Sequence, residues 1–391
     1  MTTVAIVNGN IYTISGGIIE KGTILIEGGK ITAVGKGLAA PKGAEIFDAA
    51  GKVITPGIID AHTHLGIHEE GVGIEGRDYN EKVDPVTPQM RAIDGINPDE
   101  PGTKDALAGG VTAVISGPGS ANVIGGESVA IKTYGRVIDR MVIRQPAGLK
   151  VAFGENPKRV YTELKKTPVT RMGTAALLRQ ALVAGQNYLA RIERAKGDPE
   201  KMPDRDLGME AIARVLRREV PMRAHAHRAD DMMTAIRIAE EFNVQLTLEH
   251  ATESHKITDE LAKRGIPAVV GPTLIGREKF ELRDRTFETP RVLYEAGIKF
   301  ALMTDHPVIP VQYLPLAAAL AVREGLPEDV AMRSITLSAA EIIGVADRIG
   351  SIEAGKDADL VIWSRLPLDP QARAEKVFVD GALVYDTEVS L

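Results

Sequence analysis

The histidines of this chain fall into groups, and the grouping suggests a metal site. The 391 residues include eight histidines and no cysteine. Two of the groups contain a His-x-His pair, and residues two apart on a strand point to the same side, so each pair can present two imidazoles to one cation. Without cysteine, thiol nucleophiles, disulfides, thiolate-bound zinc and iron–sulfur clusters are excluded, and a metal would need imidazole nitrogen and carboxylate oxygen. The histidines occur at four places: His62/His64/His68, His225/His227, His250/His255 and His306.

Each of these places follows an apolar stretch with the pattern of a buried strand. Taken singly, each is explained by polar residues that are hydrogen-bonded at a strand end. In a parallel barrel, however, the carboxyl ends of all strands meet at one rim. The ordinary explanation would then need four coincidences at that rim, so we interpret the motifs as parts of one site. They are Asp60-Ala-His62-Thr-His64, Arg223-Ala-His225-Ala-His227, Glu249-His250 and Asp305-His306.

The segments that must position these motifs alternate between strands and helices. Apolar runs predict strands at 57–60, 112–116, 149–153, 222–224, 244–248, 268–271 and 300–303. Periodicity predicts helices at 175–193, 208–218, 231–242, 258–264, 292–296 and 314–323. About seven such repeats favour a closed (β/α)8 barrel over an open sheet. We therefore predict a barrel domain at 56–345, with long loops that lack regular elements at 66–110 and 117–147.

The two ends of the chain are rich in short β runs instead. Near the start, Gly28-Gly29 separates two such runs, and near the end Asp380-Gly381 does the same, which indicates hairpins. Strands outside the β/α alternation cannot join the barrel. We therefore expect residues 1–55 and 346–391 to form one small β domain together.

Composition limits the partners. The formal net charge is -6, the pI is about 5.9 and aromatic residues are 4% of the chain, which argues against nucleic acid or an anionic membrane as a partner. The first residues lack the pattern of a secretory signal, and no apolar run approaches the ~20 residues needed to span a bilayer. We expect a soluble, cytoplasmic protein that acts on a small molecule.

Several motifs together resemble the amidohydrolase superfamily, closest to its imidazolonepropionase-like and prolidase-like branch. They are DAHTHLG after VITPGIID, the EH pair, the late TDHP and GSIEAGKDADLVIW. The resemblance implies an α/β fold with a distorted TIM barrel and a small β-sandwich from both termini. It also implies one or two divalent metal ions that activate water for hydrolysis of a C–N bond, with zinc expected and manganese or iron as alternatives. Members are commonly homo-oligomers.

The resemblance also assigns roles to single residues. Asp305 resembles the aspartate of the last strand, which is both a ligand and the general base. His227 and His306 adjoin expected ligands and could contact substrate, or could only hydrogen-bond around the site. Arg228 and Arg277 are candidates for binding an anionic group, against the simpler reading of ion-paired surface residues. The other expected ligands are His62, His64, His225 and His250.

A two-metal site also needs a bridging anion, for which the sequence offers two candidates. Lys150 resembles the carbamylated lysine of phosphotriesterase-like members, and its simpler role is a salt bridge at the barrel edge. Glu155 resembles the bridging carboxylate of adenine deaminase and acetylglucosamine-phosphate deacetylase types, and its simpler role is a charge at a helix start. We favour Glu155, because it lies at the strand end where the rim is expected.

The reading from sequence is thus a metal-dependent amidohydrolase that cleaves an amide or cyclic amide, including a dipeptide. A deaminase acting on a heterocycle is the alternative within enzymes. The alternative that is not an enzyme is a barrel protein without catalytic activity. The complete set of four histidines and one aspartate expected as ligands argues against that alternative. Neither a phosphate-binding Gly-x-x-x-x-Gly-Lys-Ser/Thr loop nor a Gly-x-Ser-x-Gly elbow is present. The choice of substrate should reside in loops 66–110, 117–147 and 272–290.

Overall fold

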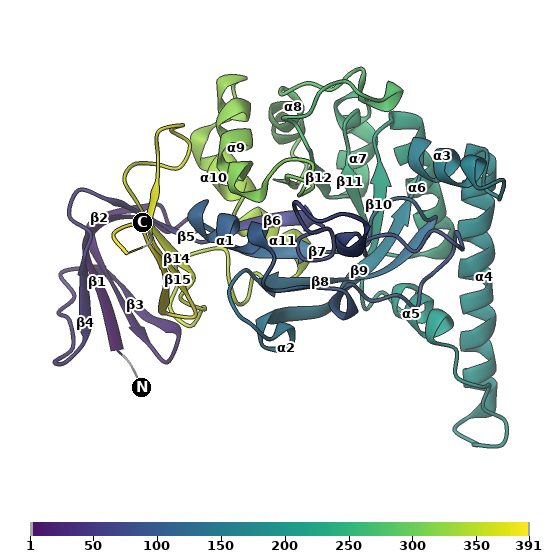
Figure 1. Cartoon of the computed structure of the whole chain (residues 1–391), viewed down its shortest axis with the longest axis horizontal. Coiled ribbons are helices and arrows are strands. Elements are labelled where there is room, and N and C mark those ends of the chain that lie inside the picture. The colour runs from purple at the N-terminus through teal and green to yellow at the C-terminus, as the bar shows by residue number, and fades with distance from the viewer. Residues whose placement is uncertain (1–2, 390–391) are drawn as a thin grey trace.

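The computed structural model describes residues 3–389 and contains two β-sheets next to each other (Figure 1). One sheet is the centre of a barrel surrounded by helices. The other lies at one end of the molecule and is built from both termini. The fold is therefore the α/β architecture expected from the sequence, a distorted TIM barrel with an additional terminal sheet.

The barrel sheet has eight strands in the order of the sequence, from β6 to β13. Backbone hydrogen bonds from Asp305 N to His62 O (3.2 Å) and from His64 N to His306 O (2.9 Å) connect the chain after the last strand to the first strand. The barrel is thus nearly closed at the rim where the histidines lie. The strands are β6 Ile58–Thr63, β7 Val111–Ser116, β8 Ile124–Lys132, β9 Val142–Ala152, β10 Met222–Ala226, β11 Leu246–His250, β12 Ala268–Val270 and β13 Phe300–Leu302.

Strand β8 corrects the sequence prediction, which treated 117–147 as a loop without regular elements. It runs antiparallel to both β7 and β9, whereas the other barrel strands pair in parallel. Its nine residues are all buried, yet they include Glu127 and Lys132, and a Gly-Gly pair follows the first residue, Ile124. Glu127 is paired with Arg214 (2.5 Å), and Lys132 is paired with three aspartates. Because these charged residues interrupt the apolar run, the sequence pattern did not indicate a buried strand here.

Helices cover the outside of the barrel, and the six helices expected from periodicity are present. The sequence missed shorter ones, α1, α2, α3, α10 and α11, of four to nine residues each. Helix α4 is the longest and extends beyond the body of the molecule (Figure 1). The helices are α1 Pro101–Ala108, α2 Ile138–Met141, α3 Glu155–Glu163, α4 Arg171–Ala195, α5 Leu207–Leu216, α6 Ala229–Phe242, α7 Thr258–Arg264, α8 Thr289–Glu295, α9 Leu314–Arg323, α10 Glu328–Ser334 and α11 Leu337–Ile343.

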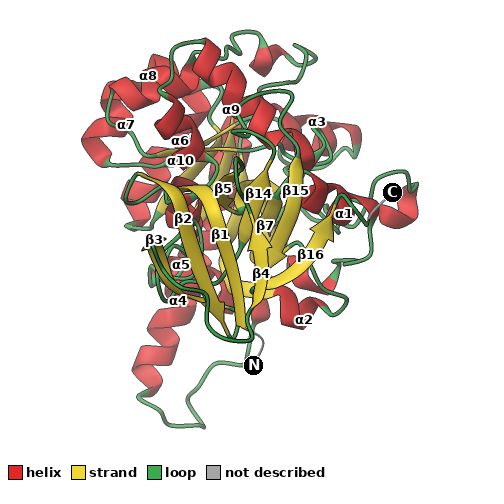
Figure 2. Ribbon diagram, turned by 90° about the vertical axis from the view of Figure 1, so that its left-hand side faces the viewer, coloured by secondary structure: helices red, strands yellow, loops and turns green. Residues whose placement is uncertain are grey.

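The terminal sheet unites the two ends of the chain (Figure 2). Strand β5 comes just before the barrel in the sequence, and β14 comes after the barrel. The two strands pair antiparallel, with Pro56 opposite Leu360 at one end and Val53 opposite Trp363 at the other. That residues 1–55 and 346–391 are the limits of the small β domain stays a prediction. The strands are β1 Thr3–Tyr12, β2 Ile18–Glu27, β3 Lys30–Lys36, β4 Glu45–Asp48, β5 Val53–Pro56, β14 Leu360–Trp363, β15 Ala374–Val379 and β16 Ala382–Asp386.

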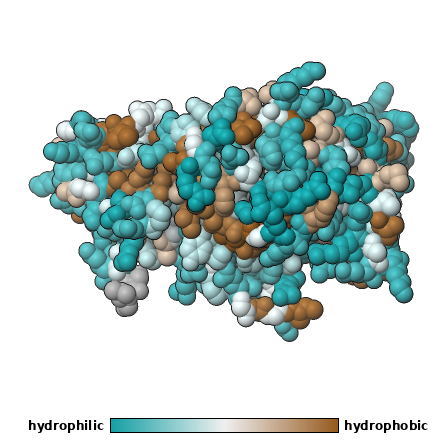
Figure 3. Space-filling view, turned by 90° about the horizontal axis from the view of Figure 1, so that it is seen from above, coloured by the Kyte–Doolittle hydropathy of each residue, from teal (hydrophilic) through white to brown (hydrophobic). Residues whose placement is uncertain are grey.

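The face shown in Figure 3 is mainly hydrophilic, with smaller hydrophobic areas between polar groups. Among residues 3–389, no helix combines the length and apolar character that a bilayer crossing requires.

Candidate metal centre

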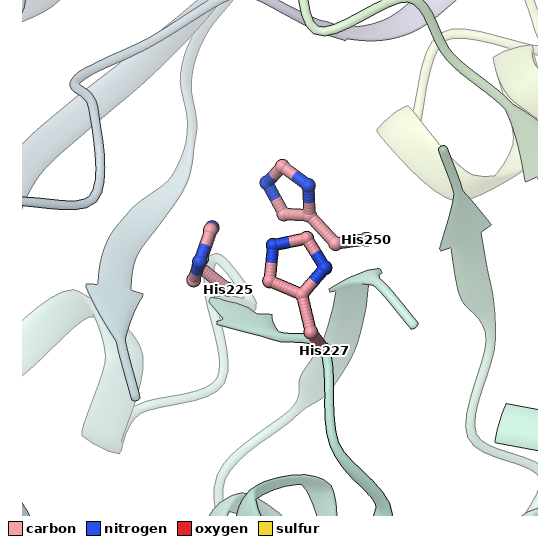
Figure 4. A group of neighbouring side chains, drawn as sticks. All are labelled: His225, His227 and His250. Carbon is pink, nitrogen blue, oxygen red and sulfur yellow. The ribbon is translucent and has the colours of Figure 1, made fainter. Parts of the chain in front are cut away.

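Six of the predicted side chains meet at the carboxyl end of the barrel. His225, His227 and His250 offer ligand atoms that lie within 4.8 Å of one another, and Figure 4 shows their rings together beside the strand ends. A second group, with the same limit, consists of His62, His64 and Asp305. The ring centroids of His62 and His250 are 5.2 Å apart, so the two groups adjoin. The structure thus brings together side chains from strands that are far apart in the sequence.

The backbone turns sharply at two of these strand ends. His250 has φ 69°, the next residue Ala251 has φ 45°, and Asp305 has φ 57°. These are left-handed conformations, which for residues other than glycine typically cost about 1–3 kcal/mol each and concentrate at functional sites. Such turns aim the His250 and Asp305 side chains at the barrel mouth rather than along their strands.

Several potential ligand atoms in these groups are buried and have no hydrogen-bond partner in the described part of the chain. They include Nδ1 of His225, Nδ1 of His250 and Oδ1 of Asp305. The Asp305 oxygen is near His62 Nε2 (3.2 Å) and His64 Nε2 (3.4 Å) without forming a hydrogen bond of good geometry. Buried polar atoms are nearly always satisfied, and an unplaced ion is one of the recognised reasons for an exception. Nitrogen and carboxylate donors that converge in this way fit a divalent cation.

The protonation states also suit a metal. Burial is the main cause that lowers the pKa of His225 and His250 well below the ordinary value, and it lowers the pKa of His227 to about 3. Burial acts to raise the pKa of Asp305, but the imidazoles of His250, His62 and His64 hold that pKa well below its usual range. Three neutral imidazoles and an ionised carboxylate therefore meet at the rim, and those are the forms that bind metals.

Groups behind these side chains fix the orientation of the rings. Glu249 accepts from His62 Nδ1 at 2.9 Å, and its two oxygens also lie 3.0 Å from Lys150 Nζ and 2.5 Å from an Arg223 nitrogen. His64 Nδ1 is 2.7 Å from the carbonyl of Gly117. A hydrogen bond at Nδ1 sets the tautomer and leaves Nε2 for a ligand. Nε2 of His64 is therefore available at the mouth, while Nε2 of His62 also lies 3.3 Å from Lys150 Nζ.

The structure separates the two candidates for a bridging anion. Lys150 is buried in β9, and its Nζ lies 3.3 Å from His62 Nε2. Glu155 begins α3, and its backbone N–H donates to Glu281 Oε2 at 3.0 Å. Its carboxylate belongs to neither group of ligand atoms and does not line the cavity above them. In this structure Lys150 is therefore the candidate that lies beside a predicted ligand, and Glu155 follows Gly154, whose φ of 79° marks a turn after the strand. Which of the two supplies a bridge stays a prediction.

Three further candidates lie away from the ligand atoms. His306 is fully buried, with Nε2 3.5 Å from Glu100 Oε1. Arg228 is paired with Asp230, and exposed Arg277 donates to the carbonyl of Arg283. None of the three lines the cavity, so the interpretation as ion-paired or hydrogen-bonded residues describes them better in this structure.

A cavity of about 310 Å³ opens above the ligand atoms and is large enough for a small molecule. Tyr79 lines it and stacks on His68, with the ring centroids 4.3 Å apart. Sequence analysis did not identify Asn156 and Lys279, which also line it. Asn156 could have been noticed, because it follows the β9 strand end in Gly-Glu-Asn-Pro. Lys279 belongs to no recognisable motif in the loop at 272–290, so the sequence alone does not single it out.

Comparison with known proteins gives consistent results. The sequence model of the Amidohydrolase family matches residues 53–384. An amidohydrolase named tasK, from Hapsidospora irregularis, is 33% identical over 399 aligned positions, which cover 95% of this chain and 40% of that protein. The chain thus spans less than half the length of that relative. An imidazolonepropionase from Mesorhizobium japonicum is 26% identical, with 93% of this chain and 90% of that protein covered.

Solved structures share the fold. The crystal structure of an amidohydrolase from Thermotoga maritima MSB8 superposes with a TM-score of 0.95 at 47% identity, covering 98% of this chain and 100% of that one. A prolidase complexed with N-methylphosphonate-L-proline superposes with a TM-score of 0.62 at 19% identity, covering 98% and 100%, which shows likeness of fold alone.

Proposed function

The chain belongs to the amidohydrolase family and is a hydrolase that acts on carbon–nitrogen bonds, and from that premise we propose that it cleaves an amide or cyclic amide of a small molecule with the help of one or two divalent ions. The observation that carries the proposal is the set of buried, unpartnered nitrogen and oxygen atoms of His225, His250 and Asp305 at the floor of one cavity. Zinc is the ion we propose, because it favours neutral imidazole and carboxylate ligands. The cytoplasmic location and the homo-oligomeric state expected from the sequence stay predictions.

The ligand atoms we assign come from two groups. His62, His64 and Asp305 would hold one ion, and His225 and His250 would hold the second where two are bound. A divalent ion in such a site acts as a Lewis acid that polarises a carbonyl and makes water more acidic. Lys150 lies close enough to His62 to contribute to a bridge if its amine is carbamylated. If it is not, its ammonium and Arg223 balance the charge of Glu249.

Asp305 is the residue we propose as the base. Its carboxylate is ionised at neutral pH and reaches the cavity. It can take a proton from the attacking water and later deliver that proton to the departing nitrogen, as a general base and acid must. His227 also faces the cavity, and its Nδ1 lies 2.8 Å from Thr252 Oγ1, which orients Nε2 toward a substrate. We propose that this nitrogen hydrogen-bonds the carbonyl oxygen or the leaving group.

The test is a hydrolysis screen with N-acyl amino acids, dipeptides and cyclic amides, using zinc- or manganese-loaded protein. We expect turnover of at least one class, its loss after chelation and its return when the ion is added back. The variant His225→Ala should be inactive. The control is His255→Ala, because His255 bonds Thr289 outside the cavity and should be dispensable for hydrolysis. Full activity of a metal-free sample would refute the proposal.

A further inference from the structure

Both anionic and cationic side chains line the cavity, and the anionic ones are Asp305 among the proposed ligands and Glu278. The cationic ones are not paired with them. They are Lys82, Arg159 and Lys279. No carboxylate of residues 3–389 forms an ion pair with any of the three. Most other half-buried cations of this protein are paired, for example Arg171 with Asp231 at 2.9 Å. A cationic group that lines a cavity and forms no ion pair of its own is suited to bind an anion that arrives with a ligand.

Lys279 is the one of the three that lies deepest. It is half-buried, whereas Lys82 and Arg159 are exposed at the cavity rim. Its ammonium donates to Asn156 Oδ1 at 3.1 Å, and Nδ2 of the same amide lies 3.5 Å from His225 Nε2. One amide side chain therefore separates the ammonium from the proposed metal ligands, and a small substrate can span that distance.

Asn156 is held firmly enough to act as a spacer. It is buried, with 8% of its surface exposed, and its amide also donates to Ser120 Oγ at 2.8 Å. Because an ammonium has three donors and Asn156 uses one, two are left for other acceptors. The same cavity has an apolar side formed by Ile275, Leu282 and Val308. The cavity thus offers a reacting end, one cationic contact and room for an apolar group.

We propose that Lys279 binds a carboxylate of the substrate, so that the substrates are small amides with a carboxylate a few bonds from the bond that is cleaved, such as N-acyl amino acids. The inference rests on the proposed function, since it takes the histidine groups as the reacting end. In the reaction the amide C–N bond breaks, the oxygen of water joins the carbonyl carbon, and its protons go to the leaving nitrogen and to the medium. A single half-buried ammonium balances one negative charge, which favours a carboxylate over a phosphate monoester.

The experiment compares the binding of matched ligands to the metal-loaded protein by calorimetry. The probes are a panel of N-acetyl amino acids and the corresponding carboxamides, which differ only in the charged group. Hydrogen bonds to a charged group contribute roughly 1.5–3 kcal/mol, so the carboxylates should bind about 10- to 100-fold more tightly than the carboxamides. Lys279→Met should abolish this preference, and Lys279→Arg should keep most of it. Lys263→Met is the matched control, because Lys263 is exposed on α7 and does not line the cavity.

Other results would overturn the inference. Equal binding of carboxylates and carboxamides, a preference that survives in Lys279→Met, or no binding of any probe would each do so. Tighter binding of N-acetyl-aminoethyl phosphate than of the carboxylates would show that the cationic contact serves a phosphate instead. Turnover separates this inference from the proposed function. A preference that depends on Lys279, with no hydrolysis of any probe, counts against the hydrolase alone. Hydrolysis without a preference counts against the role of Lys279 alone.

Discussion

Two buried clusters of polar side chains in this molecule differ in whether their members have partners. At the barrel mouth, the histidine cluster (His62, His64, His225, His227, His250 with Asp305) contains ligand atoms that nothing in the described chain satisfies. At the junction of the barrel and the terminal sheet, the lysine cluster joins Lys132 to Asp357 (3.0 Å), Asp359 (2.8 Å) and Asp380 (2.8 Å). The first cluster is incomplete without a ligand, while in the second a single ammonium meets three carboxylates.

The difference separates what these clusters do. Lys132 is the last residue of the barrel strand β8. Asp357 and Asp359 come just before β14 of the terminal sheet, and Asp380 lies in the turn between β15 and β16. The ion pairs therefore connect the barrel to the terminal sheet. A buried charge that loses its partner is strongly destabilising. The histidine cluster contributes less of this kind, because burial keeps His225 and His250 neutral and their Nδ1 atoms have no partner in the described chain. Substitutions in the histidine cluster should therefore affect chemistry, and those in the lysine cluster should affect folding.

The largest effect is expected for Asp305→Asn. General acid–base catalysis contributes typically 10²–10⁴-fold, so kcat should fall by about that factor when the carboxylate becomes an amide. The thermal midpoint should fall much less than in Lys132→Met, because Asn keeps the size of the side chain, although the lowered pKa of Asp305 shows that its neighbours favour the charged form. Steady-state kinetics and calorimetry on one preparation give both values. A large loss of stability together with retained activity would reverse the contrast between the clusters.

Lys132→Met should have the opposite profile. Removal of one member of a buried ion pair typically costs about 3–5 kcal/mol. Here buried Asp359 loses its cation, whereas Asp357 keeps Lys30 and Arg348 and the Asp380 side chain is exposed to solvent. Denaturant unfolding should show this loss, while the folded fraction keeps its metal and its turnover per active site. The control is Lys36→Met, an exposed lysine of β3, which should change the free energy of unfolding very little. Wild-type stability in Lys132→Met would show that the junction does not depend on this cluster.

The lysine cluster should also give a pH dependence of its own. Burial raises the pKa of Asp359 from 3.8 to about 6, so between these pH values the folded state binds more protons at this group than the unfolded state. Its contribution to stability is then present at low pH and is lost as the pH rises through 6. The free energy of unfolding of wild type, minus that of Asp359→Asn, should fall by roughly 2 kcal/mol from pH 4 to pH 7. A difference that is constant or rises with pH would contradict this assignment.

The smallest effect is expected behind the histidine cluster. Thr252→Val removes the hydroxyl that orients His227 at 2.8 Å. Groups that orient functional histidines typically matter 10- to 100-fold, and we expect about 10-fold in kcat/KM because a neighbouring ring is affected rather than a metal ligand. Thr252→Ser keeps the hydroxyl and should keep most of the activity. An equal loss in both variants would indicate a packing effect instead of a hydrogen bond.

Periodicity and the motifs at strand ends were enough to predict the barrel and the position of the histidines in it. The barrel follows from alternating elements, and each His-x-His pair lies at a strand end because strand geometry places both rings on one side. The buried strand β8 was missed because its charges, Glu127 and Lys132, are neutralised by residues distant in the sequence. The choice between Lys150 and Glu155 depends on where β9 ends, and Lys279 depends on how a long loop folds over the barrel. Neither is encoded in a local pattern.

The most direct test of the account is the metal content of purified protein, measured by mass spectrometry after growth with zinc and dialysis. We predict at least one divalent ion per chain in wild type and in Lys132→Met that is folded, and a marked loss in His225→Ala and in a His62→Ala variant that unfolds like wild type. Wild type that lacks metal yet hydrolyses its substrate at full rate, or histidine variants that keep the wild-type metal content, would contradict the account.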